Sequence, residues 1–353
     1  GLRGDREARA VPLRERPLQA PISANHFVLE YDEQSVVGEP QVVFTNGSDT
    51  LSDLARTYGL GFDELIAANP GVDPWLPGDN TPVLLPTQFV LPDVPRRGIV
   101  LNIASKRLFY FPDMPEGANQ IVKTYPIGIG RVGWETPLGT TAVVAKARDP
   151  HWFVPASVRR EHAELGDPLP AVVPPGPENP LGHRVLKLEM PGYLIHGTNQ
   201  PYGVGMRVSH GCVRLYPENI ELLYELVEIG EPVAIVNEPY LLGARDGQLY
   251  FEAHEPLEDD PASPGERLAE LLAGSHSPSL RQGDKDHVTA LASIGNGVPA
   301  RLDSRDAAEV LTRVRVVHNV VETDPDAPTL SEVSDMIDEA VREAREETAT
   351  ETL

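Results

Sequence analysis

Cysteine is almost missing from this sequence, which has one, Cys212, among its 353 residues. No internal disulfide is therefore possible, and the fold must be stabilised by its hydrophobic core. The sequence also has no run of about 18 apolar residues, the length that a membrane-spanning helix requires. Its apolar fraction of 41% is still well above that of a disordered chain. The length indicates two or three domains, because single domains typically contain about 100–200 residues.

Basic residues are scarce as well. The sequence contains 30 lysines and arginines and 53 acidic residues, which gives a formal net charge of −23. A charge of this sign argues against nucleic acid or an anionic membrane surface as the main partner. Roughly −14 of the charge lies beyond residue 250. Such an acidic tail is usually a solvating, partly flexible segment; the alternative is that it contacts a basic partner or gates a site.

The segment 40–90 has the pattern of a small βααβ unit. We predict strands at 41–45 and 82–86, and helices at 51–58 and 62–68. Apolar residues recur at helical spacing in both helical segments, and each is followed by a residue that ends helices. Residues 1–39, which precede this unit, are predicted to form an N-terminal arm.

This unit resembles a LysM module, through Asp49-Thr50-Leu51, Tyr58-Gly59, Ala68-Asn69-Pro70 and Pro77-Gly78. The resemblance implies binding to glycan chains that contain N-acetylglucosamine, in a groove formed by roughly residues 47–51 and 69–75. The implied glycan-binding residues are Asp49, Thr50, Asn69 and Trp75. Two of them have a plainer alternative, since Trp75 can pack in the core and Asp49 can cap a helix.

Residues 96–238 contain short strand-like segments separated by glycine and proline turns, which indicates a mainly β domain. One helix is predicted between Pro217 and Gly230. The proline-rich stretch 146–182 has few strand signals, and we interpret it as a long loop that forms a lid or wall. Residues 239–353 are predicted to form an acidic C-terminal extension of unknown function, either α/β or partly disordered.

The most informative motif is His196-Gly197-Thr198, followed by Ser209-His210-Gly211-Cys212-Val213-Arg214. A thiol attacks acyl groups as the thiolate, and an imidazole can accept its proton and later return it to a leaving amine. Gly211 permits a tight turn, after which the backbone N–H groups of 210–212 can converge on an oxyanion. The fork of Arg214 suits a substrate carboxylate. The alternative is a β domain with a buried cysteine and two structural histidines.

The complete motif resembles that of the L,D-transpeptidase family (YkuD-like, ErfK/YbiS-type), and Trp134–Thr140 also fits the family's turn. The resemblance covers about residues 96–238 and implies a β-sandwich-like catalytic domain. It assigns the base to His196, oriented by the backbone carbonyl of Gly197. The implied oxyanion hole consists of His210, Gly211 and Cys212. The implied substrate-binding residues are Arg214, Ser209 and Thr198.

The resemblance also implies a reaction. Cys212 attacks a peptidoglycan tetrapeptide stem at the bond between the diamino acid and D-alanine, and the resulting thioester is resolved by an amine. The acceptor would be another stem, or a lysine of an outer-membrane lipoprotein or other protein. Water as acceptor would make the enzyme an L,D-carboxypeptidase or a hydrolase of cross-links, and a non-catalytic cell-wall-binding protein is the alternative from another class. No metal or organic cofactor is expected, and the implied location is the periplasm or another part of the cell envelope.

Overall fold

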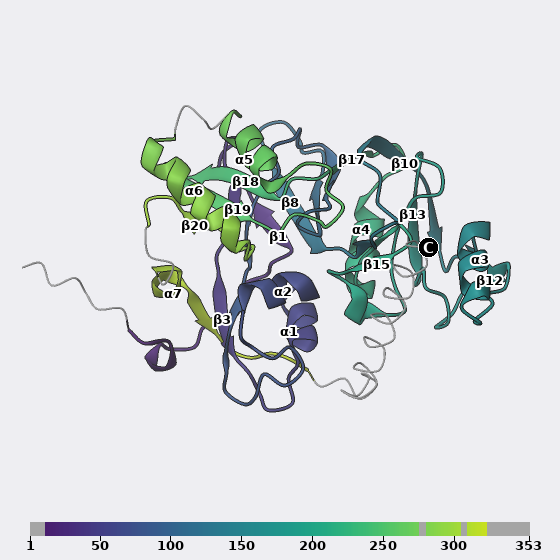
Figure 1. Ribbon diagram of the computed structural model, residues 1–353, viewed down its shortest axis with the longest axis horizontal. Coiled ribbons are helices and arrows are strands. Elements are labelled where there is room, and N and C mark those ends of the chain that lie inside the picture. Colours follow the sequence, from purple (N-terminus) through teal and green to yellow (C-terminus); the bar gives the residue numbers. More distant parts are fainter. Residues whose placement is uncertain (1–10, 275–279, 305–308, 323–353) are drawn as a thin grey trace, which may run out of the picture.

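A nine-stranded mixed sheet forms the centre of the molecule (Figure 1). The computed structural model describes residues 11–274, 280–304 and 309–322. The strand order is β1-β8-β7-β6-β17-β10-β13-β14-β16, and neighbours are antiparallel except for the parallel pairs β6/β17 and β14/β16. These strands are β1 His26–Val28, β6 Gly98–Asn102, β7 Arg107–Phe111, β8 Ile121–Pro126, β10 Gly139–Arg148, β13 Arg184–Leu188, β14 Leu194–His196, β16 Val213–Arg214 and β17 Pro232–Val236. The chain is therefore a mixed α/β protein.

Both faces of this sheet are covered by apolar side chains. Successive residues of a strand point to opposite faces. Accordingly, Ile99 and Leu101 of β6 belong to the cluster that includes helix α4 (Pro217–Leu226), whereas Val100 belongs to a second cluster. The predicted helix after residue 217 is thus confirmed. It ends at Leu226 because Val227 is already extended, with φ −81° and ψ 132°.

The second cluster joins the sheet to the βααβ unit. This unit contains β3 (Gln41–Phe44), α1 (Leu51–Thr57), α2 (Phe62–Ala68) and β4 (Pro82–Leu85), and β3 pairs antiparallel with β4. The predicted order of elements is confirmed, while the identity of the unit as a LysM module stays a prediction. Its apolar residues share one core with the sheet residues Phe109 and Val122. The unit is therefore packed against the nine-stranded sheet through a continuous hydrophobic core.

The N-terminal segment takes part in sheets. Strand β1 pairs with β8 at the edge of the large sheet, and β2 (Val36–Gly38) pairs with β5 (Gln88–Val90). A 3-10 turn, η1, spans Leu13–Glu15. Three-residue strands are too short to show an alternating pattern, so the sequence indicated only an arm over 1–39. That the segments 1–39, 40–90, 96–238 and 239–353 are separate units stays a prediction.

The C-terminal extension is ordered α/β structure over its described residues. Strands β18 (Tyr240–Arg245), β19 (Gln248–Ala253) and β20 (Ala300–Arg301) form a sheet. Helices α5 (Pro264–Leu272) and α6 (Gln282–Ile294) share a hydrophobic cluster with it. After α7 (Glu309–Arg313), β21 (Arg315–Val317) pairs in parallel with β3 of the βααβ unit. The spacing of Leu330, Val333, Ile337 and Val341 predicts an amphipathic helix, but these positions lie outside the described residues.

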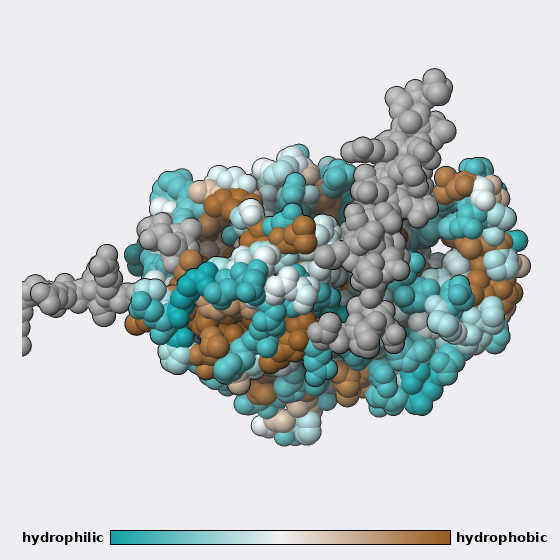
Figure 2. Space-filling model, turned by 90° about the horizontal axis from the view of Figure 1, so that it is seen from below, coloured by the Kyte–Doolittle hydropathy of each residue, from teal (hydrophilic) through white to brown (hydrophobic). Residues whose placement is uncertain are grey.

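The stretch 146–182 differs from the loop that its sequence suggested. It contains α3 (Ala156–Glu164) and a small sheet of β11 (Trp152–Phe153) and β12 (Val172–Val173). Only Val158 of α3 is buried, so the helix has no apolar stripe for the sequence to reveal. Figure 2 shows apolar surface along the rim where α3 and β12 lie in Figure 1, and Phe153 is 73% exposed. We call residues 152–173 the lid.

Within the described residues, no helix has the length and apolar character needed to cross a membrane.

Candidate active site

Cys212 lies in a tight turn between two short strands. Strand β15 (Arg207–Ser209), which pairs with β9 (Ile129–Gly130), leads into the turn, and β16 follows it. Gly211 has φ +105°, and a Cβ there would lie 3.0 Å from the ring of Tyr193, so glycine is required. The hydroxyl of buried Ser209 donates to the carbonyl of Cys212 at 2.5 Å. This hydrogen bond of Ser209 thus stabilises the turn from its buried side.

His196 reaches this turn through strand pairing. It is the last residue of β14, which pairs in parallel with β16 so that His196 lies opposite Arg214. Its side chain is buried, and Nδ1 donates to the carbonyl of Gly197 at 2.5 Å, which is the contact implied by the family resemblance. This bond fixes the tautomer and leaves Nε2 as the proton acceptor.

The pKa values of Cys212 and His196 are both shifted in the direction that favours the neutral side chain. Burial, together with the charge of Arg214, lowers the pKa of His196 to about 3, although the bond to Gly197 opposes this. Burial raises the pKa of the Cys212 thiol, against the opposing effects of the Leu194 backbone and Arg214. The thiol lies 3.8 Å from the carbonyl of Gly192, to which it donates. Both shifts favour a thiol beside a neutral imidazole over a thiolate–imidazolium pair.

The remaining implied substrate-binding residues have different surroundings. Arg214 is partly buried, and its Nε has no hydrogen-bond partner among the described residues. The positive charge of its guanidinium suits an incoming carboxylate. Thr198 is 4% exposed, and its hydroxyl accepts a hydrogen bond from the backbone of Gln200 at 2.9 Å. Thr198 and Ser209 are therefore engaged in shaping loops, whereas Arg214 keeps an unused donor.

Glu161 and Arg131 were not identified from the sequence. The Nε2 of His210 lies 2.8 Å from the Glu161 carboxylate and 3.3 Å from the Arg131 guanidinium, which also pairs with Glu161. The edge of the Trp134 ring packs against His210, with centroids 4.7 Å apart. Burial and the two nearby arginines lower the pKa of His210, while Glu161 raises it. Because Glu161 belongs to α3, these contacts attach the lid to the catalytic motif.

The residues of the implied glycan site all lie in the βααβ unit, and each makes contacts within the protein. Asp49 accepts hydrogen bonds from Asn46 and from Asn319, both at 2.7 Å. The helix cap is Thr50, which forms a capping box with Asp53.

The other two residues of this set are engaged as well. Asn69 bonds to the backbone of Leu65 and Leu84, and Trp75 stacks on Phe62 with centroids 5.2 Å apart. The described contacts bring none of the four to Cys212. Their glycan-binding role stays a prediction.

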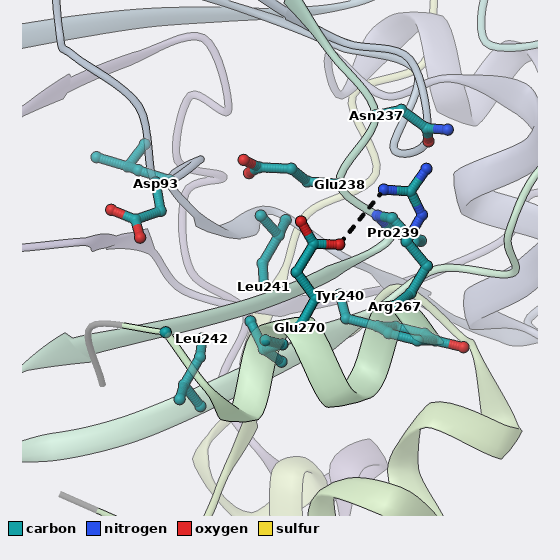
Figure 3. A pocket seen from close by; sticks show the side chains of 12 residues that line it. Asp93, Asn237, Glu238, Pro239, Tyr240, Leu241, Leu242, Arg267 and Glu270 are labelled. Atoms are coloured by element: carbon teal, nitrogen blue, oxygen red, sulfur yellow. Dashed lines mark ion pairs between the residues drawn. The ribbon is translucent and has the colours of Figure 1, made fainter. Parts of the chain in front are cut away.

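Two cavities lie away from the cysteine. One of about 190 Å³ lies between residues 237–242 and α5, with the Arg267–Glu270 ion pair at its wall (Figure 3). The other, of about 420 Å³, lies beside α6. Neither cavity is lined by a residue of the motif that contains His196 and Cys212.

Comparisons with known proteins give one consistent result. Residues 96–235 match YkuD, the L,D-transpeptidase catalytic domain. The probable L,D-transpeptidase YbiS of Escherichia coli K12 is 40% identical over 289 residues, covering 80% of this chain and 93% of that protein. The probable L,D-transpeptidase YcfS of the same organism is 42% identical over 295 residues, covering 80% and 89%. The NMR structure of the catalytic domain from an E. faecium L,D-transpeptidase aligns with a TM-score of 0.30 and 21% identity, over 41% of this chain and 99% of that one.

Proposed function

This chain belongs to the L,D-transpeptidase family, and we propose that it is a peptidoglycan L,D-transpeptidase with Cys212 as nucleophile and His196 as base. The observation that carries the proposal is the parallel pairing of β14 with β16, because it sets a buried, oriented imidazole beside the cysteine turn. A β-sandwich-like form of the catalytic domain is part of the proposal.

The first half of the reaction forms the thioester. The carbonyl of the diamino acid enters beside Cys212, whose sulfur attacks the carbonyl carbon as its proton passes to Nε2 of His196. The backbone N–H groups of residues 210–212 stabilise the oxyanion, and that of Gly211 gives up its 3.3 Å hydrogen bond to the Ser209 hydroxyl to do so. When the intermediate collapses, the carbon–nitrogen bond to D-alanine breaks and the leaving amine takes the proton from His196. Free D-alanine and an acyl-enzyme result.

The second half returns the free enzyme. An acceptor amine attacks the thioester carbonyl, His196 takes a proton from that amine, and the sulfur leaves as the thiol after receiving it. An acceptor on another stem gives a cross-link, a lysine of an envelope protein gives an anchor, and water gives a carboxypeptidase. Arg214 holds a carboxylate of the donor stem through the charge of its guanidinium. No step requires a cofactor.

The location and the glycan contacts extend this proposal. A peptidoglycan substrate places the enzyme in the cell envelope. The βααβ unit would add binding to glycan chains through the surface around Asp49, Thr50, Asn69 and Trp75. Binding of the Trp75→Ala variant to isolated sacculi, compared with that of the Leu76→Ala variant, tests this addition. Equal binding would remove it.

Intact-protein mass spectrometry tests the central proposal. The protein is mixed with a disaccharide-tetrapeptide, beside a Cys212→Ala control. We expect an adduct of the tripeptide-acyl mass on the wild type alone, together with released D-alanine. A wild-type protein with neither adduct nor D-alanine would reject the transpeptidase and leave the wall-binding alternative. The products formed with added amine acceptors distinguish cross-linking, anchoring and hydrolysis.

A further inference from the structure

The turn that carries Cys212 is held on its N-terminal side by one arginine. Arg207 begins β15, whose ladder with β9 is only two pairs long and irregular. Its Nε donates to the carbonyl of Gly130 at 2.8 Å. Its Nη1 and Nη2 donate to the two carboxylate oxygens of Asp259 at 2.8 and 2.9 Å. The two side chains are 15% and 17% exposed, and such a two-pronged pair defines the position of both partners.

Asp259 belongs to residues 257–260, here called the strap, which connect β19 to α5. The strap is anchored on both sides of Asp259. Leu257 packs in the core cluster of the catalytic sheet. Asp260 accepts a hydrogen bond at 2.8 Å from Arg267 of α5, the arginine that also pairs with Glu270 in Figure 3. The carboxylate of Asp259 is therefore presented from a fixed backbone.

The strap also contacts the other side of the cysteine turn. The carboxyl group of Glu135 lies near Asp259, and the backbone at Glu135 lies against Gly211, where a Cβ would be 3.4 Å from the Glu135 carbonyl oxygen. The hydrogen bonds from Arg207 hold the pKa of Asp259 below its usual range, so the carboxylate is charged at neutral pH. Asp259 thus binds the strand before the turn through Arg207 and lies near the loop that packs on the turn.

We propose that Asp259 is a positioning residue for the catalytic cysteine, acting through Arg207 on the backbone of residues 209–212. The proposal rests on the proposed function, because it concerns the reaction of Cys212. It gives the C-terminal extension a part in catalysis. The strap sets the direction of the backbone N–H groups at 210–212 and of the sulfur relative to His196. Displacements of about 1 Å at such groups can cost about 100-fold in rate.

The test compares Asp259→Asn with two matched variants. Asp259→Glu keeps the charge, and Asp303→Asn removes a similar two-pronged pair, with Arg301, elsewhere in the extension. Single-turnover thioester formation is followed by mass spectrometry over a range of tetrapeptide concentrations. We expect the maximal rate of Asp259→Asn to fall about 10- to 100-fold, with a half-saturating concentration within about twofold of the wild type. Asp259→Glu should recover part of the loss, and Asp303→Asn should react as the wild type does.

A rate for Asp259→Asn within twofold of the wild type would overturn the proposal, as would an equal loss in Asp303→Asn. Hydrogen exchange of the amides of residues 203–216 gives a second measurement that needs no substrate. There we expect about tenfold faster exchange in Asp259→Asn alone. If the wild type formed no thioester, the proposed function would fail, and the exchange result would decide on the strap: lost protection supports it and unchanged protection rejects it.

Discussion

At the scale of single residues, burial shifts the pKa values of the proposed catalytic pair, His196 and Cys212. His196 is buried and its pKa is about 3, so it is neutral and able to accept a proton throughout the neutral range. The Cys212 thiol has a raised pKa and keeps its proton there. The base function is present above the folded pKa of His196 and is lost only as the pH falls through it.

We therefore expect the rate of thioester formation to be nearly constant between about pH 5 and 8, with an acid limb well below pH 5. Alkylation of Cys212 by iodoacetamide, which needs no substrate, should be slow at pH 7 and rise steeply above pH 9, because the free thiolate forms only there. Single-turnover kinetics and alkylation rates across this range check both statements. Rapid alkylation at pH 6, at a rate that does not rise further between pH 6 and 8, would contradict both statements. It would indicate a resting thiolate–imidazolium pair.

At the scale of elements, the lid is attached to the catalytic motif by Glu161. We expect Glu161→Gln to release α3, because the neutral amide cannot form the ion pair with Arg131 and makes a weaker hydrogen bond with His210. Amide hydrogen exchange over residues 156–164 should become several-fold faster. Glu164→Gln, an exposed change on the same helix, is the control. Equal exchange in the two variants would show that Glu161 does not hold the lid.

The backbone of the βααβ unit at Gly61 lies directly against the backbone at Gly205, in the loop between β14 and β15. A Cβ at Gly205 would lie 2.4 Å from Cα of Gly61, and Gly205 has φ +85°. We expect Gly205→Ala to be about 1–3 kcal/mol more destabilising than Gly71→Ala. Gly71 has φ +86° with nothing nearby, so it shares only the backbone strain. Urea unfolding measures both free energies. Similar values for the two variants would mean that the loop moves away at little cost.

At the scale of the whole molecule, the C-terminal extension is part of the fold. Strand β21 extends the sheet of the βααβ unit, and Val317 lies in the core that this unit shares with the catalytic sheet. Leu257 lies in the other core cluster. The extension thus contributes to both hydrophobic clusters of the catalytic sheet.

We accordingly expect truncation after residue 239 to abolish cooperative unfolding as well as activity, because both clusters lose apolar contacts. Circular dichroism during thermal denaturation measures this. Truncation after residue 322 keeps all the residues that the structure describes. This variant is the control and should unfold cooperatively. A protein ending at 239 that unfolds as sharply as the control would show that the extension is dispensable for folding.

Local patterns in the sequence were sufficient for the motif and for several elements. His196, Cys212 and Arg214 were identified because their spacing and flanking glycines are confined to two short segments. The βααβ order and the helix at 217 were predictable because apolar periodicity and turn residues are local properties. The proposed acyl transfer could also be predicted from the sequence, because it depends on the thiol of a cysteine and the imidazole of a histidine.

Only the tertiary structure decided which distant segments meet. The contacts of Glu161 with His210 and of Asp259 with Arg207 join residues 49 and 52 positions apart, and no periodicity marks either carboxylate. The low pKa of His196 likewise requires burial, which a motif does not specify. The physical reason is the same in each case: long-range packing depends on the whole chain, whereas the motif and the helices depend on their own neighbours in the sequence.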